Sequence, residues 1–247
     1  MEEGTARARA LLRQKGRIVA FTGAGVSTAS GIPDFRSPGG VWSRYRPVPF
    51  DDFLASDEGR RRYWLYKRET HAAFAGARPN AAHHALVELE REGRLLAVVT
   101  QNIDGLHQDA GSTRVVEVHG TNRRLECVQC GRGGPVEEAM RATGVPTCEA
   151  CGGWVKPATI SFGQDLRPEV LAEAFQLARE CDLMLVLGSS LVVYPAASVP
   201  ELAVRRGVPL VVINREPTPL DPLAAAVLHG PIEELLPALV RPPGGAS

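Results

Sequence analysis

Four short apolar runs, each ending in small or polar residues, limit the fold of this chain more than any other feature. Continuous apolar runs of this length are typical of strands that are buried on both faces of a parallel sheet. Buried helices are the alternative, and the runs are too short to favour them. The runs are RIVAFTGAG (17–25), LLAVVTQN (95–102), DLMLVLGSS (182–190) and VPLVVIN (208–214).

Helical patterns separate these runs, for example over 80–92, 168–180 and 196–206, and an amphipathic helix is predicted over 2–15. Strands that alternate with helices predict an α/β fold with a doubly wound, Rossmann-like parallel sheet. In such sheets ligands bind at the carboxyl ends of the strands. We therefore expect functional residues where the apolar runs end.

The length and charge of the chain set broad limits. Its 247 residues fit one large domain, or a large domain with a small one. Its 28 basic and 28 acidic side chains give a formal net charge of zero, which argues against electrostatic binding to nucleic acid or to an anionic membrane. No apolar run reaches the ~20 residues that span a bilayer, and the start of the chain has no apolar signal core. We expect a cytoplasmic protein.

Two segments interrupt the alternation of strand and helix. Residues 38–79 contain prolines, aromatics and arginines, and are predicted to form a loop and a helical insertion. Residues 122–156 contain four paired cysteines and little apolar material, so we expect this segment to need a metal in order to fold. Together the two segments are predicted to form a small zinc-ribbon and helical domain. The large, discontinuous domain is predicted to comprise 1–37, 80–121 and 157–247.

The paired cysteines form two Cys-x-x-Cys turns, Cys127 with Cys130 and Cys148 with Cys151. Two such turns supply four thiolates for a tetrahedral zinc ion, at a spacing within the usual range. Four protein ligands leave no open coordination position, so one structural zinc is predicted. Two disulfides are the alternative, which a reducing cytosol disfavours. The fifth cysteine, Cys181, is interpreted as a small buried hydrophobic side chain.

The first apolar run ends in GAGVS (23–27). Glycines at the end of a strand permit a tight turn and a close approach of the backbone to a pyrophosphate. The motif is weak by itself, because an ordinary strand-to-helix turn would also account for it. The following SGIPDFR (30–36) strengthens it, since it predicts a rigid loop over a ligand and offers Arg36 to a phosphate.

The second apolar run leads into TQNIDGLH (100–107). Gln101, Asn102 and Asp104 can present donors and acceptors to an amide and to ribose hydroxyls. The alternative is a loop whose polar side chains bond its own backbone. Three polar side chains around one isoleucine, Ile103, favour a binding site.

His119 ends a strand-like run (115–118) immediately before the cysteine segment. A histidine can accept a proton near neutral pH, although a lone histidine is more often structural. Its position beside the other motifs makes His119 the candidate general base. Structural or surface roles are assigned to four other histidines: His71, His83, His84 and His229.

These motifs, in this order, resemble those of the sirtuins over roughly residues 5–240. Further matching segments are SFGQDL (161–166), GSSLVVYPA (188–196) and INRE (213–216). The resemblance implies an enzyme that consumes NAD to remove acyl groups from protein lysines, giving nicotinamide, O-acyl-ADP-ribose and free lysine. The acyl oxygen would attack C1′ of the nicotinamide ribose. His119 would then act as general base on a ribose hydroxyl, with Asn102 positioning the ribose or a water and Asp104 holding the carboxamide.

The resemblance also assigns binding residues. Those assigned to NAD are Gly23, Ala24, Gly25, Ser27, Phe35, Arg36, Gln101, Asn102, Ile103, Asp104, His119, Gly188, Ser189, Ser190, Asn214, Glu216 and Ile232. The peptide substrate would lie as an added strand between two edges of the site. Those edges are formed by Phe162 and Gly163 and by Leu191, Val192 and Val193.

The chain departs from the sirtuin pattern at a few positions. Ser189 stands where the family often has threonine, which keeps a hydroxyl, and Gln164 stands where many members have glutamate. Sirtuins that prefer succinyl or malonyl lysine resemble one another in a Tyr-x-x-Arg pair in the helical insertion. Here Tyr66 follows Tyr63 at that spacing, and Glu69 follows Tyr66. We expect Glu69 to repel an acidic acyl group, so that acetyl or longer aliphatic groups are preferred.

Two other activities stay open at this point. A protein ADP-ribosyltransferase or NAD glycohydrolase could use the same scaffold, and release of nicotinamide that depends on an acyl peptide would separate deacylation from it. A zinc-ribbon module that binds nucleic acid without catalysis is disfavoured by the balanced charge and by His119 and Asn102. The expected partners are therefore acyl-lysine proteins, with no membrane and no direct nucleic-acid binding.

Overall fold

The computed structural model describes residues 2–34 and 46–241 and contains a six-stranded, wholly parallel sheet of order β3-β2-β1-β7-β8-β9. Counted along the chain within this sheet, the order is that of the Rossmann fold. The predicted fold class is confirmed. The strands are β1 (Ile18–Thr22), β2 (Leu95–Thr100), β3 (Val115–Glu117), β7 (Leu183–Leu187), β8 (Leu210–Ile213) and β9 (Ala226–Leu228).

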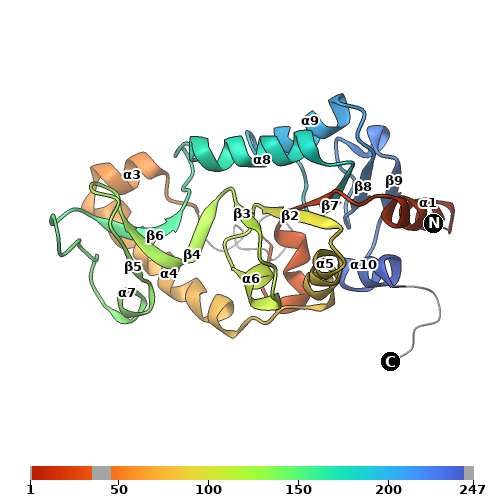
Figure 1. Cartoon of the computed structure of the whole chain (residues 1–247). Coiled ribbons are helices and arrows are strands. Elements are labelled where there is room, and N and C mark those ends of the chain that lie inside the picture. Colours follow the sequence, from red (N-terminus) through yellow and green to blue (C-terminus); the bar gives the residue numbers. More distant parts are fainter. Residues whose placement is uncertain (1, 35–45, 242–247) are drawn as a thin grey trace.

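Helices cover both faces of this sheet (Figure 1). Successive side chains of a strand point to opposite faces, so in β1 Ile18 and Ala20 join one core while Val19 and Phe21 join the other. Both cores are fully buried at these positions, which is why the strands are continuous apolar runs. The first core packs against α1 (Glu2–Gln14), α5 (Ala81–Arg91) and α10 (Ile232–Val240), and the second against α8 (Pro168–Glu180) and α9 (Ser198–Arg205).

The sequence does not predict β9 and α10. β9 is only three residues long, and α10 contains Pro237 inside the helix, a residue that normally ends a helical pattern. The other predicted helices of the large domain lie within two residues of their expected bounds, and each predicted strand lies inside its apolar run. Among the described residues, no helix combines the length and the apolar character that crossing a bilayer requires.

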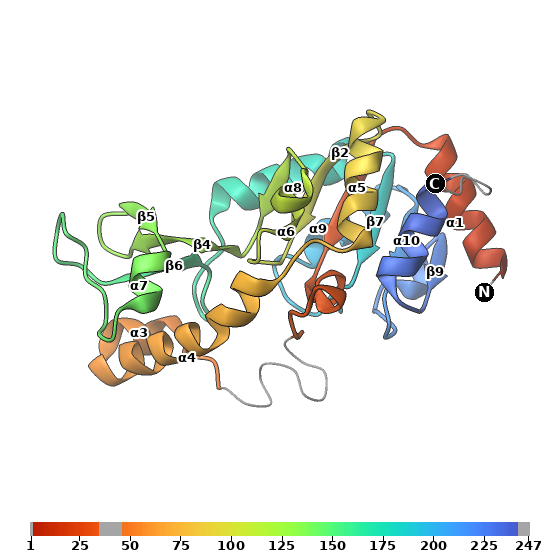
Figure 2. The same ribbon diagram turned by 90° about the horizontal axis from the view of Figure 1, so that it is seen from below.

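The small domain lies at one end of the molecule (Figure 2). It combines a three-stranded antiparallel sheet of order β5-β4-β6 with helices from the insertion. The side chain of Ser56 caps the long insertion helix by accepting from the N–H of Gly59 at 2.9 Å. The elements are α3 (Phe50–Ala55), α4 (Asp57–Gly76), β4 (Gly120–Cys127), β5 (Gly133–Pro135), α7 (Glu137–Arg141) and β6 (Val155–Thr159).

The two interrupting segments share one apolar core. Phe53 and Trp64 of the insertion are fully buried, and Trp154 and Met140 of the cysteine segment pack against the same cluster. The indole N–H of Trp64 donates to the carbonyl of Val155 at 3.1 Å. The cysteine segment does not build this core by itself, in line with its low apolar content, because α3 and α4 supply the fully buried side chains.

Candidate active site

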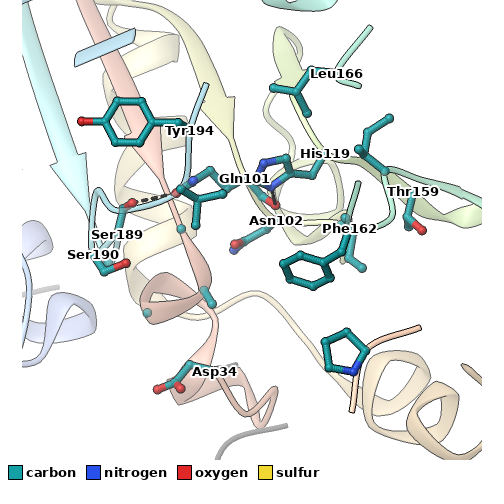
Figure 3. A pocket seen from close by; sticks show the side chains of 18 of the residues that line it. Asp34, Gln101, Asn102, His119, Thr159, Phe162, Leu166, Ser189, Ser190 and Tyr194 are labelled. Carbon is teal, nitrogen blue, oxygen red and sulfur yellow. Dashed lines mark hydrogen bonds between the residues drawn. The ribbon is translucent and has the colours of Figure 1, made fainter. Parts of the chain in front are cut away.

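A cavity of about 1070 Å³ opens at the carboxyl ends of β1, β2, β7 and β8 and extends to the small domain (Figure 3). β1 and β7 are neighbours from which the strand order runs in opposite directions. This switch point is where Rossmann-type sheets bind their ligands, because the two following loops diverge there. The cavity therefore lies where the ends of the apolar runs predict it.

Glycines bring the loops after β1 and β7 together, backbone against backbone. The N–H groups of Gly23 and Gly25 donate to the carbonyls of Leu187 and Gly188, at 3.0 and 2.9 Å. A Cβ on Gly25 would lie 2.7 Å from the Cα of Gly188, and Gly188 itself has a φ of +63°. Larger residues at these positions would separate the loops. The predicted close approach of this backbone to a pyrophosphate stays a prediction.

The loop after β2 is hydrogen-bonded to the loops that follow β1 and β7. The side-chain oxygen of Gln101 accepts from the Ser189 hydroxyl at 2.6 Å (Figure 3). Asn102 is buried, and its Nδ2 donates to the hydroxyl of Ser27 at 3.1 Å. Ser27 in turn donates to Oδ2 of Asp104 at 2.7 Å. A relay of hydrogen bonds therefore fixes Asn102 at the cavity wall.

Asp104 stands behind this wall. Its second carboxylate oxygen, Oδ1, accepts from the N–H of Leu106, the first residue of α6 (Leu106–Ala110), at 2.9 Å. Burial raises the pKa of Asp104, and the hydrogen bonds from Leu106 and Ser27 oppose that rise. The carboxyl group is thus a buried acceptor that holds the loop.

His119 lines the cavity, and its ring Nδ1 lies 3.0 Å from the carbonyl oxygen of Gln101. A carbonyl oxygen can only accept, so Nδ1 carries the proton and Nε2 keeps its lone pair. Burial lowers the pKa of His119 below its usual value of 6.5, and the bond to Gln101 opposes that shift. The imidazole is therefore neutral at pH 7 and can accept a proton.

Most residues that the sequence assigned to NAD lie in this cavity wall, although Ser27 and Asp104 lie behind it. Phe35 and Arg36 lie outside the described residues. At one end, Nδ2 of Asn214 donates to the carbonyl of Glu216 at 2.7 Å and closes the loop after β8. The assigned residues in the wall are Gly23, Ala24, Gly25, Gln101, Asn102, Ile103, His119, Gly188, Ser189, Ser190, Asn214, Glu216 and Ile232.

The assigned peptide edges are only partly at the cavity. Phe162, Gly163 and Val193 line it, and the Phe162 side chain is 48% exposed, as an open groove requires. Leu191 is instead buried in the core beneath α8 and α9, and its φ of +56° turns the chain at this point. Val192 is exposed and lies outside the wall.

Gln164 has a local role. Its side-chain oxygen accepts from the N–H of Ser161 at 3.1 Å, and its own N–H donates to the carbonyl of Ser161 at 3.0 Å. A glutamate oxygen could accept in the same way, so the neutral side chain still closes the turn that carries Phe162.

Sequence reasoning placed the acyl pocket on the insertion helix, α4, but missed Lys67. Tyr63, Tyr66 and Lys67 line it, whereas Glu69 is exposed, so the expectation that Glu69 faces the acyl group is wrong. Nζ of Lys67 donates to Oδ1 of Asn122 at 3.1 Å. Burial lowers the pKa of Lys67 to about 7. The available signal was a lysine at helical spacing from buried aromatic residues.

The four paired cysteines come together at the far end of the small domain. Their sulfur atoms all lie within 4.8 Å of one another, with 3.6 Å between Cys127 and Cys151 and 3.7 Å between Cys130 and Cys148. Tetrahedral zinc with bonds of ~2.3 Å separates its sulfur ligands by about 3.8 Å, so the cluster fits that ion. None of the five cysteines is in a disulfide.

The fold and the site together define a Rossmann-type, dinucleotide-binding enzyme with a four-cysteine small domain. A model of the Sir2 family matches residues 23–195. The chain is 46% identical over 241 residues to the NAD-dependent protein deacetylase 1 of Bradyrhizobium diazoefficiens, covering 96% of this chain and 95% of the relative. It is 40% identical over 245 residues to the NAD-dependent protein deacylase 2 of Archaeoglobus fulgidus, covering 98% and 96%.

A solved structure described as a structural basis for the mechanism and regulation of Sir2 enzymes superposes with a TM-score of 0.88 at 40% identity, over 97% of each chain. A Sir2 homologue in complex with NAD superposes with a TM-score of 0.81 at 39% identity, over 90% of this chain and 87% of the other. The chain belongs to the Sir2 family, the sirtuins.

Proposed function

We propose that this protein removes acyl groups, acetyl first among them, from lysine side chains of proteins and consumes NAD in doing so. The observation that best supports this proposal is the position of His119, whose Nδ1 faces the carbonyl of Gln101 and leaves the lone pair on Nε2. His119 lines the same cavity as the glycine loops and the exposed Phe162. The products would be nicotinamide, O-acyl-ADP-ribose and free lysine. The names of the relatives and a Sir2 structure solved with a deacetylated peptide and 3′-O-acetyl ADP-ribose support this assignment.

Each part of the cavity has a proposed role. The glycine loops would let the diphosphate of NAD come close to the backbone, with Ser189 and Ser190 beside it. Asn214, Glu216 and Ile232 would hold the adenosine end. Bound NAD supplies an electrophilic ribose carbon and a leaving nicotinamide.

His119 would take the proton from a ribose hydroxyl, a step that typically contributes ~10²–10⁴ in rate. Asn102, fixed through Ser27, would position the ribose or a water. Asp104, which lies behind the wall, would fix the loop at the nicotinamide end through Ser27 and Leu106, so the role at the carboxamide that the resemblance implies becomes an indirect one. Phe35 and Arg36 keep their proposed roles over the ribose and at a phosphate.

One experiment tests the proposal against its rivals. The protein is incubated with NAD and a panel of acyl-lysine peptides, and the products are followed by mass spectrometry. Nicotinamide release that requires the acyl peptide, with O-acyl-ADP-ribose as product, is expected. Release of nicotinamide without peptide, or ADP-ribose attached to protein, would instead indicate a glycohydrolase or an ADP-ribosyltransferase.

We further propose that the enzyme works in the cytoplasm, without direct binding to nucleic acid. Four thiols gathered for a metal suit a reducing compartment, and the formal net charge is zero. The division into 1–37, 80–121 and 157–247 for the NAD-binding domain, and 38–79 with 122–156 for the small domain, is likewise a proposal. Two separate sheets and a separate apolar core in the small domain support it.

Asp104→Asn is expected to weaken inhibition by nicotinamide about tenfold, which corresponds to one hydrogen bond to a charged group. An amide offers only one acceptor where the carboxylate accepts from both Ser27 and Leu106. The inhibition constant of nicotinamide is the measurement, and Asp51→Asn, at an exposed position of α3, is the matched control. An unchanged inhibition constant would contradict this role.

The acyl preference is expected to depend on pH through Lys67. Its pKa of about 7 leaves the amine largely neutral at pH 8, where a buried succinyl carboxylate would lack a cation. We expect kcat/KM to favour acetyl- over succinyl-lysine at least about tenfold at pH 8, about 1.4 kcal/mol. The ratio of kcat/KM for acetyl-lysine to kcat/KM for succinyl-lysine should decrease at pH 6, where Lys67 is protonated. In Lys67→Met this ratio should be the same at pH 6 and pH 8. A tenfold preference for succinyl at pH 8 would contradict the proposed neutral acyl substrate.

A further inference from the structure

The loop that carries Asn102 is held from outside by three of its backbone carbonyl groups. His119 Nδ1 contacts the carbonyl of Gln101 at 3.0 Å, and the N–H of Asn122 donates to the carbonyl of Ile103 at 2.9 Å. Nε of Arg123 donates to the carbonyl of Asp104 at 2.9 Å. All three groups come from residues 119–123, at the start of β4, so one short segment holds the loop by hydrogen bonds.

Of these three residues, Arg123 reaches furthest, because its side chain also contacts α6. Its guanidinium donates through Nε to Asp104 and through both terminal nitrogens to the carboxylate of Asp109 on α6. One planar side chain thereby bridges the start and the end of the turn that follows the loop, in the fork geometry that suits guanidinium and carboxylate.

The turn is shaped around this guanidinium. Gly105 has a φ of +73°, and a Cβ there would lie 2.0 Å from Nε of Arg123. Glycine therefore serves two needs at once, because it permits the left-handed conformation and leaves room for the side chain. A surface ion pair that formed by chance would not need such a space.

The hydrogen bond from Arg123 to Asp104 is connected to Asn102 through Ser27. Asp104 accepts from Ser27, and Ser27 accepts from Asn102. Fixing the backbone of Asp104 therefore fixes the position from which its carboxylate holds Ser27. Arg123 lies on a strand of the small-domain sheet, so the small domain holds the loop of the large domain at this point.

We propose that Arg123 is a positioning residue for the nicotinamide end of the NAD site, acting through the backbone carbonyl of Asp104. The proposal rests on the proposed function of the same cavity. The competing interpretation is an ordinary surface ion pair between Arg123 and Asp109, whose side chains are 45% and 40% exposed. Such pairs contribute little and act on stability alone.

Four variants separate the two interpretations. Arg123→Met removes every donor and keeps the length of the side chain. Asp109→Asn disrupts the ion pair but leaves Nε free to donate to Asp104. Arg124→Met, at the exposed neighbouring position of β4, is the matched control for loss of charge. Arg123→Lys restores the charge without the planar fork.

The measurements are kcat, KM for NAD, KM for the acetyl peptide, the nicotinamide inhibition constant and Tm. Arg123→Met is expected to lower kcat/KM for NAD and to raise the nicotinamide inhibition constant, each about tenfold, with KM for the peptide unchanged. Arg123→Lys should recover part of the loss. Asp109→Asn should cost at most about threefold, and Arg124→Met should have no effect.

Equal kinetic losses in Arg123→Met and Asp109→Asn would overturn the proposal, and so would a loss in Arg123→Met no larger than that in Arg124→Met. Direct titration of wild type and variants with NAD keeps this test separate from the proposed function. If the wild type binds NAD but deacylates no peptide, the proposed function fails. In that case, weaker NAD binding by Arg123→Met than by Asp109→Asn would still support the role of Arg123. Equal NAD binding by the two variants would contradict it.

Discussion

Replacing His119 with alanine is expected to lower the rate of deacylation by at least ~10²-fold while leaving NAD binding largely intact. The bond from Nδ1 to the carbonyl of Gln101 fixes both the ring and its tautomer, so the lone pair stays on Nε2. Alanine removes the proton acceptor. It leaves in place the glycine loops and the tie between Gln101 and Ser189, which do not involve the ring.

The pH dependence of the wild type gives an independent check. Because burial lowers the pKa of His119 below 6.5, the ring is already neutral at pH 7. We expect kcat/KM to stay level from pH 7 to 8 and to fall only below about pH 6.5, as the ring is protonated. His119→Gln should be slow at every pH and should lack this acid limb.

The matched control is His84→Ala, which removes an exposed histidine from α5. Calorimetric titration with NAD measures binding, and initial rates with an acetyl-lysine peptide measure turnover. A His119→Ala variant that keeps near-normal turnover would mean that the histidine is structural. Loss of NAD binding equal to the loss of turnover would mean that its main role is to position the cofactor loop.

The parts of the site that the sequence predicts are those in which a short motif fixes both residue type and place. Gly25, Gln101 and His119 lie within three residues of the ends of β1, β2 and β3. Ligands bind at the carboxyl ends of parallel strands, so these positions follow from the strands alone. The four cysteines are equally local, because each pair forms its own turn. These predictions needed only the positions of strands and turns.

Other features of the site depend on contacts between residues far apart in the sequence, which a local sequence pattern does not predict. Whether Asp104 faces the cavity or stands behind it is decided by Ser27, which is distant in the sequence. Lys67 and Glu69 lie on one helix, and at ~100° per residue two positions place them about 200° apart. The packing of Trp64 sets the rotation of that helix, so Lys67 enters the cavity and Glu69 faces solvent.

The remaining prediction with a large effect concerns the metal. Removal of zinc is expected to unfold the outer part of the small domain and, with it, to abolish activity, although no step of the chemistry uses the ion. Structural zinc sites bind with roughly 10–16 kcal/mol, which matches or exceeds the whole stability of a typical domain. Without the ion, the turns at Cys127 and Cys148 lose what holds them together.

The activity is expected to follow the fold because β4 joins the two sites. The strand begins at Gly120, directly after His119, and ends at the zinc ligand Cys127. β6 pairs with β4 at both ends, Gly120 with Thr159 and Cys127 with Val155, although the register is irregular between them. The N–H of Ile160, just beyond β6, donates to the carbonyl of His119 at 2.8 Å. Loss of the cysteine cluster would release one end of the β4–β6 pair, whose other end positions His119.

Metal analysis should find one zinc ion per chain, and Cys148→Ala should lose both the metal and thermal stability, whereas Cys181→Ala should keep the metal because Cys181 lies outside the cluster. The large domain has two cores of its own, and the small domain keeps an apolar cluster around Trp64. The variant should therefore melt in two steps, with the six-stranded sheet unfolding near the wild-type temperature. Retention of zinc by Cys148→Ala, with a water in place of the thiolate, would contradict a closed structural site and would reopen a chemical role for the ion.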